Sequence, residues 1–146
     1  MQTRDELIAK IKSIGSPPAT PDDPAPYPVV SLDDFFQGNH DESSIGCNLA
    51  DAHPGMEVFY EVLRTVKSRH DVSDVMVEIT DLNEDGTDMW PFSDRVYIIT
   101  SASEGEVDSW VRALHPDEVA EGFPADVPVG FPPIPAGAKV FGVWWD

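Results

Sequence analysis

Residues 75–100 read VMVEITDLNEDGTDMWPFSDRVYIIT, and this stretch decides the class of fold that we expect. Apolar Val75, Val77 and Ile79 alternate with other residues, which is the period of a half-exposed strand. After a polar loop, residues 95–100 form a nearly continuous apolar run, typical of a buried strand. The stretch therefore predicts two consecutive β-strands joined by a loop.

A helix is predicted on each side of these two strands. Residues 54–69 begin with a proline, which a first helical turn tolerates, and then keep one face apolar. Residues 103–114 begin with Ser103 and Glu106, the spacing of a capping box. Because apolar residues at helical spacing follow in both segments, we expect both helices to pack against the sheet.

Two weaker strand signals complete the predicted core. An apolar segment at residues 44–49 predicts a short first strand, and residues 139–145 predict a final one. The order βαββαβ is that of ferredoxin-like domains, and it favours a mainly antiparallel four-stranded sheet with two helices on one face. Without the first strand, the expected fold is still an α+β two-layer sandwich.

The chain of 146 residues is expected to form a single domain. Residues 1–15 predict an N-terminal helix that starts with a capping box. Residues 16–30 are rich in proline and predict an extended strap that connects elements and contributes nothing to the core. Residues 31–146 are left as the α+β core.

Charge is the strongest functional signal of the sequence. The formal net charge is -18, and residues 13–63 and 70–94 contain no lysine or arginine. Such a field repels nucleic acid and anionic membranes and attracts basic proteins. Because the bases are mostly placed at helix ends, we expect the strap and two loops to form one acidic surface. The predicted partner surface comprises Asp33, Asp34, Asp41, Glu42, Asp85, Asp88 and Trp90.

The loop at residues 81–94 resembles the opening of an EF-hand calcium loop, with oxygen-bearing side chains at alternate positions before Gly86. Position twelve is Phe92 where the motif needs a bidentate glutamate, and the flanks are strands. We therefore favour a polar hairpin loop that turns at Asp85 and Gly86. Weak Ca²⁺ binding is the alternative, with the candidate ligands Asp81, Asn83, Asp85, Thr87 and Asp94.

Catalysis has little support in the sequence. Cys47 is the one thiol, and His40 and His53 lie near it, so thiol chemistry is one alternative. No base lies close enough in sequence to activate Cys47, which we expect to be buried. A carboxylate pair such as Asp33 and Asp41 is another possible catalytic site. The common signatures of nucleotide, zinc and serine-hydrolase sites are absent, so we expect neither an enzyme nor a cofactor.

The location of the protein is expected to be the cytoplasm. Its first residues mix charges and lack the apolar stretch of a signal peptide, and no apolar run approaches the length of a membrane span. A lone cysteine agrees with a reducing compartment. The sequence does not indicate an oligomeric state.

Three segments, residues 30–39, 44–48 and 90–97, resemble small uncharacterised bacterial acidic proteins. In size, charge and class the chain is also similar to immunity proteins that neutralise toxin domains, including the SUKH-type group. This resemblance implies a non-catalytic protein that binds a basic partner, as an immunity or antitoxin-type inhibitor does. A third alternative is that the acidity serves solubility alone.

Overall fold

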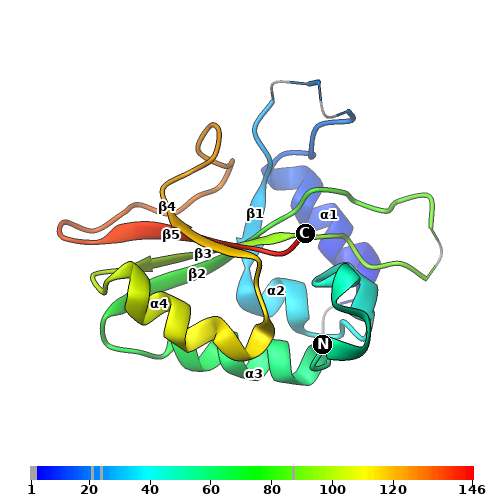
Figure 1. Ribbon diagram of the computed structural model, residues 1–146. Helices are drawn as coiled ribbons and strands as arrows, with labels where there is room; N and C mark the ends of the chain where they lie inside the picture. Colours follow the sequence, from blue (N-terminus) through cyan, green and yellow to red (C-terminus); the bar gives the residue numbers. More distant parts are fainter. Residues whose placement is uncertain (1–2, 21, 24, 87) are drawn as a thin grey trace.

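Figure 1 presents the computed structural model, which describes residues 3–20, 22–23, 25–86 and 88–146. The helical elements are α1 (Arg4–Ile14), α2 (Leu32–Phe36), η1 (Glu42–Ser44), η2 (Cys47–Ala52), α3 (Met56–Lys67), α4 (Glu104–Val111) and η3 (Arg112–Leu114), where η marks a 3₁₀ segment. The strands are β1 (Val29–Ser31), β2 (Val72–Glu78), β3 (Arg95–Thr100), β4 (Glu118–Glu121) and β5 (Lys139–Trp144).

The strands form one antiparallel sheet in the order β1-β2-β3-β5-β4. Helices α2, α3 and α4 lie on one side of this sheet, while the strap and the 122–138 loop rise on the other (Figure 1). The predicted α+β sandwich is thus confirmed. The sheet has five strands instead of the expected four, because residues 118–121 pair with β5, and its order is not that of a ferredoxin-like domain.

The predicted strand at residues 44–49 is wrong, because the segment forms the 3₁₀ elements η1 and η2. Gly46 has a φ of 67°, a left-handed conformation that interrupts any extended run. The hydroxyl of Ser44 donates to the carbonyl of Asp41 at 2.6 Å, and the amide of Leu49 donates to the carbonyl of Gly46 at 3.0 Å. Local hydrogen bonds therefore satisfy the backbone that a strand would have paired.

The first strand of the sheet lies in the segment that was predicted to be strap. Val29 and Val30 are each 1% exposed, and Val30 pairs with Val77 of β2. Residues 16–30 therefore do contribute to the core. The reason is that Val29 and Val30 follow the last proline of the strap, so their amides are free to join a ladder.

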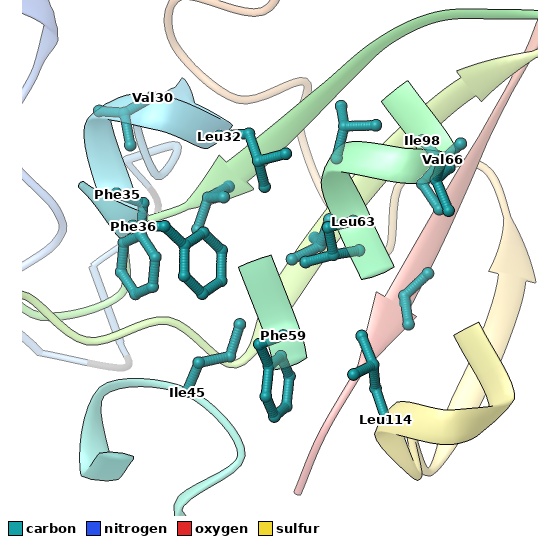
Figure 2. Close-up of a cluster of buried hydrophobic side chains, with 14 of the residues drawn as sticks. Val30, Leu32, Phe35, Phe36, Ile45, Phe59, Leu63, Val66, Ile98 and Leu114 are labelled. Carbon is teal, nitrogen blue, oxygen red and sulfur yellow. The ribbon is translucent and has the colours of Figure 1, made fainter. Parts of the chain in front are cut away.

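Helix α3 provides much of the core on the helix side of the sheet. Figure 2 shows Phe59, Leu63 and Val66 of this helix facing the sheet residue Ile98 and Leu114 of η3. Their spacing of three and four residues places them on one helical face, and all are at most 2% exposed. The most periodic segment of the sequence thus forms the predicted helix.

The opposite face of the sheet has a smaller apolar cluster of its own. The ring of Tyr97 lies 5.2 Å from that of Phe123 and 5.6 Å from that of Phe131, centroid to centroid. Successive side chains of a strand point to opposite faces of the sheet, and the two C-terminal tryptophans follow this rule. Trp145 is buried in the helix-side core, and Trp144 faces the other way. The 122–138 loop therefore covers part of this face and leaves the rest open beside the strap.

Candidate functional site

Two adjoining hollows of about 310 and 520 Å³ lie where the strap passes over the open face of the sheet. They share Tyr27 of the strap and Thr80, and together we call them the strap cleft. Arg95 is the one basic side chain among the described residues that line this cleft. Its carboxylates come from the strap, the sheet and two loops: Asp23, Glu78, Asp81, Glu84, Asp85, Asp94 and Asp126.

The pleat of β2 and β3 places the central charged residues in the cleft. Val77 points into the helix-side core, so Glu78 points to the other face of the sheet. Arg95 lies directly opposite Glu78 in the antiparallel register. Gly142 of β5 leaves room for the guanidinium, because a Cβ atom there would come within 3.1 Å of Arg95 Nη1.

Glu78 is only 6% exposed although it is a carboxyl group. Burial raises its pKa, while a hydrogen bond with Tyr97 and the positive charge of Arg95 act in the opposite direction. Burial, followed by the nearby charge of Glu78, also raises the pKa of Tyr97. The phenol is therefore protonated at neutral pH and can donate to the Glu78 carboxylate.

Asp94 is the second partly buried carboxyl group of the cleft. Burial raises its pKa, and a hydrogen bond from the indole of Trp144 opposes that shift. The Trp144 Nε1 atom lies 3.4 Å from Asp94 Oδ2. The cleft thus contains two carboxyl groups that release their protons less readily than usual, beside one arginine.

Of the predicted partner surface, only Asp85 lines the strap cleft. Asp33 accepts a hydrogen bond from the Tyr60 hydroxyl at 2.6 Å, and Asp34 forms a 2.8 Å ion pair with Lys10. The remaining predicted acids are placed elsewhere: the Asp41 carboxylate accepts from the Trp90 amide at 2.9 Å, and Glu42 and Asp88 are exposed.

Trp90 does not lie on the surface as predicted. It is 7% exposed, and its indole Nε1 donates to the carbonyl of Phe35 at 2.9 Å. Its main-chain amide is held by Asp41. Trp90 therefore anchors the 81–92 loop to α2 and to the turn before η1, and a partner would not reach its ring.

The 81–94 loop has no base of its own, but bases from elsewhere in the chain partly neutralise it. The Arg4 guanidinium donates to the carbonyls of Asn83 at 2.5 Å and of Met89 at 2.6 Å, and also to those of Glu84 and Gly86. Lys12 forms an ion pair with Glu84. Helix α1 thus brings bases from the N-terminus onto a loop that has none of its own.

The 81–92 segment forms a loop closed by an antiparallel bridge between Asp81 and Phe92. The Asp81 carboxylate accepts from the Asn83 amide at 2.8 Å, and Asp94 lies beyond the closing bridge. Thr87 is outside the described residues. A calcium ion in this loop would compete with Arg4 for its carbonyl oxygens. The described residues contain no group of three or more metal-ligating side chains.

Cys47 is exposed, contrary to the expectation that it is buried. His53 lies with its Nε2 atom 2.9 Å from the carbonyl of Ile45, and its Nδ1 atom accepts from the amide of Gly55 at 3.0 Å. Both ring nitrogens therefore have main-chain partners. This histidine serves to hold the turn before α3.

Residues 2–143 match the family model described as "Uncharacterized protein YfbO family". The chain belongs to this family. A YfbO-family relative, "Uncharacterized protein YfbO" of Escherichia coli (strain K12), is 37% identical over 142 residues, which cover 97% of each chain. No solved structure was found to match.

Sequence reasoning did not single out Glu78, Arg95 or Tyr97 in this YfbO-family chain. A signal was present, because Glu78 shares a strand face with Met76 and lies in a segment otherwise apolar. A charged residue on a buried strand face requires a partner of opposite charge, and the next strand begins with Arg95. Finding the pair required the register of β2 and β3, which the length of the intervening loop does not reveal.

None of the described helices combines the length and the apolar character needed to cross a membrane.

Proposed function

We propose that this YfbO-family protein is a non-catalytic binding protein whose strap cleft receives a basic segment of a protein partner. The observation that carries the proposal is the lining of the two adjoining hollows, which contains carboxylates from four parts of the chain and, among the described residues, a single arginine. Tyr27 and Pro128 add apolar walls. Lysine and arginine side chains match such a site, since their aliphatic stems pack on apolar walls while their charges meet carboxylates.

The net charge of -18 supports the same proposal at longer range. An acidic chain attracts a basic partner before contact and speeds their encounter, and salt screens this attraction. The proposal places the protein in the cytoplasm and requires no cofactor. An immunity or antitoxin role, in which the partner is a basic toxin, is the specific form of this function that we favour.

The test replaces three exposed carboxylates of the cleft, Asp23→Asn, Asp85→Asn and Asp126→Asn. Asparagine keeps one side-chain oxygen, so the fold should be retained. The matched control removes the same charge at residues that line neither hollow, Asp51→Asn, Glu104→Gln and Glu118→Gln.

Both variants and the unmodified protein are used as bait in native lysate at low and at high salt. We expect the unmodified protein and the control to retain the same basic partner at low salt, and the cleft variant to lose it. Retention by the cleft variant, equal loss by the control, or capture that ignores salt would each contradict the proposal.

Acid–base catalysis in the cleft is a second candidate, favoured by one observation. Burial raises the pKa of both Glu78 and Asp94 in a hollow that also contains Arg95, a pattern found in catalytic sites. Glu78→Gln would abolish turnover if this candidate is right. Capture by the cleft together with no turnover of any substrate offered would favour the binding role.

A further inference from the structure

Arg95 is a feature of the strap cleft that a purely acidic site for a basic segment does not explain. It lines the first hollow, of about 310 Å³, whose carboxylates are those of Asp23, Glu78, Asp94 and Asp126. A basic segment that enters this hollow is attracted by the four carboxylates and repelled by the guanidinium. A base at this place therefore matches a ligand that also has a negative group.

Strand β3 holds Arg95 on the open face of the sheet. Its neighbour Val96 is buried in the helix-side core, so alternation places Arg95 on the same face as Tyr97. The Arg95 side chain passes over Gly142 of β5, where an added Cβ atom would lie 3.1 Å from Nη1 and 3.8 Å from Cδ of Arg95. The strand face and this glycine therefore give the side chain its place in the hollow.

The Arg95 guanidinium makes no hydrogen bond or ion pair within the part of the chain that the structure describes. The hydrogen bonds of this residue are made by its main chain, which contacts the Ser93 hydroxyl at 3.0 and 3.2 Å. Its charge acts on Glu78 and Asp94 through space. Because Arg95 is only half-buried, its five N–H donors are available to a ligand.

A simple anion is a poor ligand for this arginine. The chain has a net charge of -18, and the hollow itself has four carboxylates against one base, so a phosphate or a nucleic acid is repelled. A ligand that places a carboxylate on Arg95 must also bring positive charge to the surrounding acids. A lysine or arginine at the carboxyl end of a polypeptide has both groups in one residue, whereas the same residue inside a chain lacks the carboxylate.

The size and the walls of the cleft agree with the end of a chain. The first hollow is at the small end of the range of ligand pockets, and Tyr27 and Pro128 offer apolar contact to an aliphatic stem. The second hollow, of about 520 Å³, adjoins it at Tyr27 and Thr80. Its lining includes Asp81 and Asp85, so basic residues that precede the chain end have carboxylates to meet there.

We propose that the first hollow of the strap cleft recognises the carboxyl-terminal residue of the partner's basic segment. The terminal carboxylate binds the Arg95 guanidinium, and the positive side chain of the same residue meets the carboxylates of the hollow. Guanidinium and carboxylate are both planar and can form two parallel N–H···O bonds. This inference rests on the proposed function and adds to it that the bound segment is a chain end.

The test compares two forms of a six-residue peptide of alternating alanine and lysine that ends in lysine, one with a free carboxylate and one with a terminal amide. Amidation makes the peptide more positive, so attraction to a chain of charge -18 favours the amide. We expect the opposite order in isothermal titration calorimetry, with the free carboxylate bound at least about tenfold more tightly. Equal affinities, a preference for the amide, or failure of both peptides to bind at millimolar concentration would overturn the inference.

Arg95→Gln tests the residue itself, because glutamine keeps a polar side chain and removes the charge. This variant should bind the free-carboxylate peptide no more tightly than the amide. The matched control is Arg112→Gln, which removes the same charge at an exposed arginine that lines neither hollow and should keep the preference. Circular dichroism checks that both variants are folded. A preference that persists in Arg95→Gln, or that disappears in the control, would refute the role of Arg95.

The Asp23→Asn, Asp85→Asn and Asp126→Asn variant separates this inference from the proposed function. If the unmodified protein binds both peptides equally and this variant loses both, the chain-end inference fails and the acidic site does not. If the variant binds the free-carboxylate peptide as tightly as the unmodified protein does, the acidic site is contradicted and recognition by Arg95 is not. Free lysine that binds as tightly as the peptide would contradict a polypeptide end as the source of the carboxylate.

Discussion

Arg4 occupies a position that is unfavourable for a base in a helix, because it lies in the first turn of α1, where the helix dipole is positive. Its contacts explain why a base is there. The guanidinium is surrounded by main-chain carbonyls of the 81–92 loop, including those of Asn83 and Met89. One residue of the N-terminus thus holds a loop almost eighty positions away.

Replacing Arg4 by alanine should therefore destabilise the protein by about 2 kcal/mol, because four main-chain carbonyls, two of them in partly buried hydrogen bonds, lose a charged donor. The measurement is the free energy of unfolding in urea. Arg112→Ala is the control, since the Arg112 guanidinium forms an exposed ion pair with Asp108 and its removal should change stability by less than about 0.5 kcal/mol. Equal effects of the two substitutions would contradict the role assigned to Arg4.

Glu78 makes the stability of the protein depend on pH in a direction opposite to that of most acids. Burial raises its pKa in the folded state above the value of about 4.3 in the unfolded chain. The protonated form is therefore favoured by folding, so its contribution to stability is present below pH 4.3 and is lost as the pH rises through the folded pKa.

Glu78→Gln should remove this dependence, because glutamine is neutral at every pH. We expect the variant to gain stability relative to the unmodified protein as the pH rises through this window. Urea unfolding of both proteins in a series of buffers measures the difference. A difference that stays constant with pH, or that falls as the pH rises, would show that the raised pKa of Glu78 does not contribute to stability.

At the scale of elements, the segments with a strong local signal formed as predicted. Helix α3 and strands β2 and β3 have clear apolar periods, and α4 begins with the complete capping box of Ser103 and Glu106. The segments that were predicted wrongly, η1 with η2 and β1, are short. The strand β1 depends on a distant partner, since Val30 pairs with β2, whereas η1 and η2 form through local hydrogen bonds and the left-handed Gly46.

Gly46 distinguishes the observed turn from the predicted strand. An alanine at its φ of 67° is strained, and its Cβ atom would lie 3.0 Å from Leu49 Cδ1 and 3.1 Å from Phe59 Cζ. We expect Gly46→Ala to lower the free energy of unfolding by about 1–3 kcal/mol. In a strand, the same substitution would stabilise the protein, because glycine weakens strand interiors.

The matched control is Gly105→Ala in α4, where an added Cβ atom has open space. This substitution should stabilise the protein by up to about 1 kcal/mol, since alanine favours helix. Thermal and urea unfolding of the two variants should thus differ in sign. A neutral or stabilising effect of Gly46→Ala would argue against the left-handed turn.

At the scale of the whole molecule, the excess of acid is distributed over many elements instead of one uninterrupted face. Helix α1 contributes Lys10 to Asp34 and Lys12 to Glu84, which partly neutralises the surface that the sequence suggested. The strap cleft remains the concave region that carboxylates from several elements line, with one arginine among its described lining residues. The cleft carboxylates therefore differ from the other acidic residues of the chain in that they lie together in a concave region.

The net charge of -18 has a consequence for stability that can be measured directly. Like charges repel within the compact state, and salt screens this repulsion. We expect the midpoint of urea unfolding to rise when sodium chloride is increased from low to about physiological ionic strength. A midpoint that falls would mean that the ion pairs, such as Lys10 with Asp34, contribute more than the net repulsion.

The amino-acid sequence by itself determined the α+β class, the main helix and the two central strands, because periodicity and capping act over a few neighbouring residues. Only the tertiary structure decided that Arg4 fills the 81–92 loop and that Glu78 meets Arg95 beneath the strap. These contacts depend on strand register and on packing between distant segments. Strand register and long-range packing cannot be inferred from neighbouring residues. The sequence therefore showed only that the chain is acidic, and the tertiary structure showed which carboxylates line the cleft.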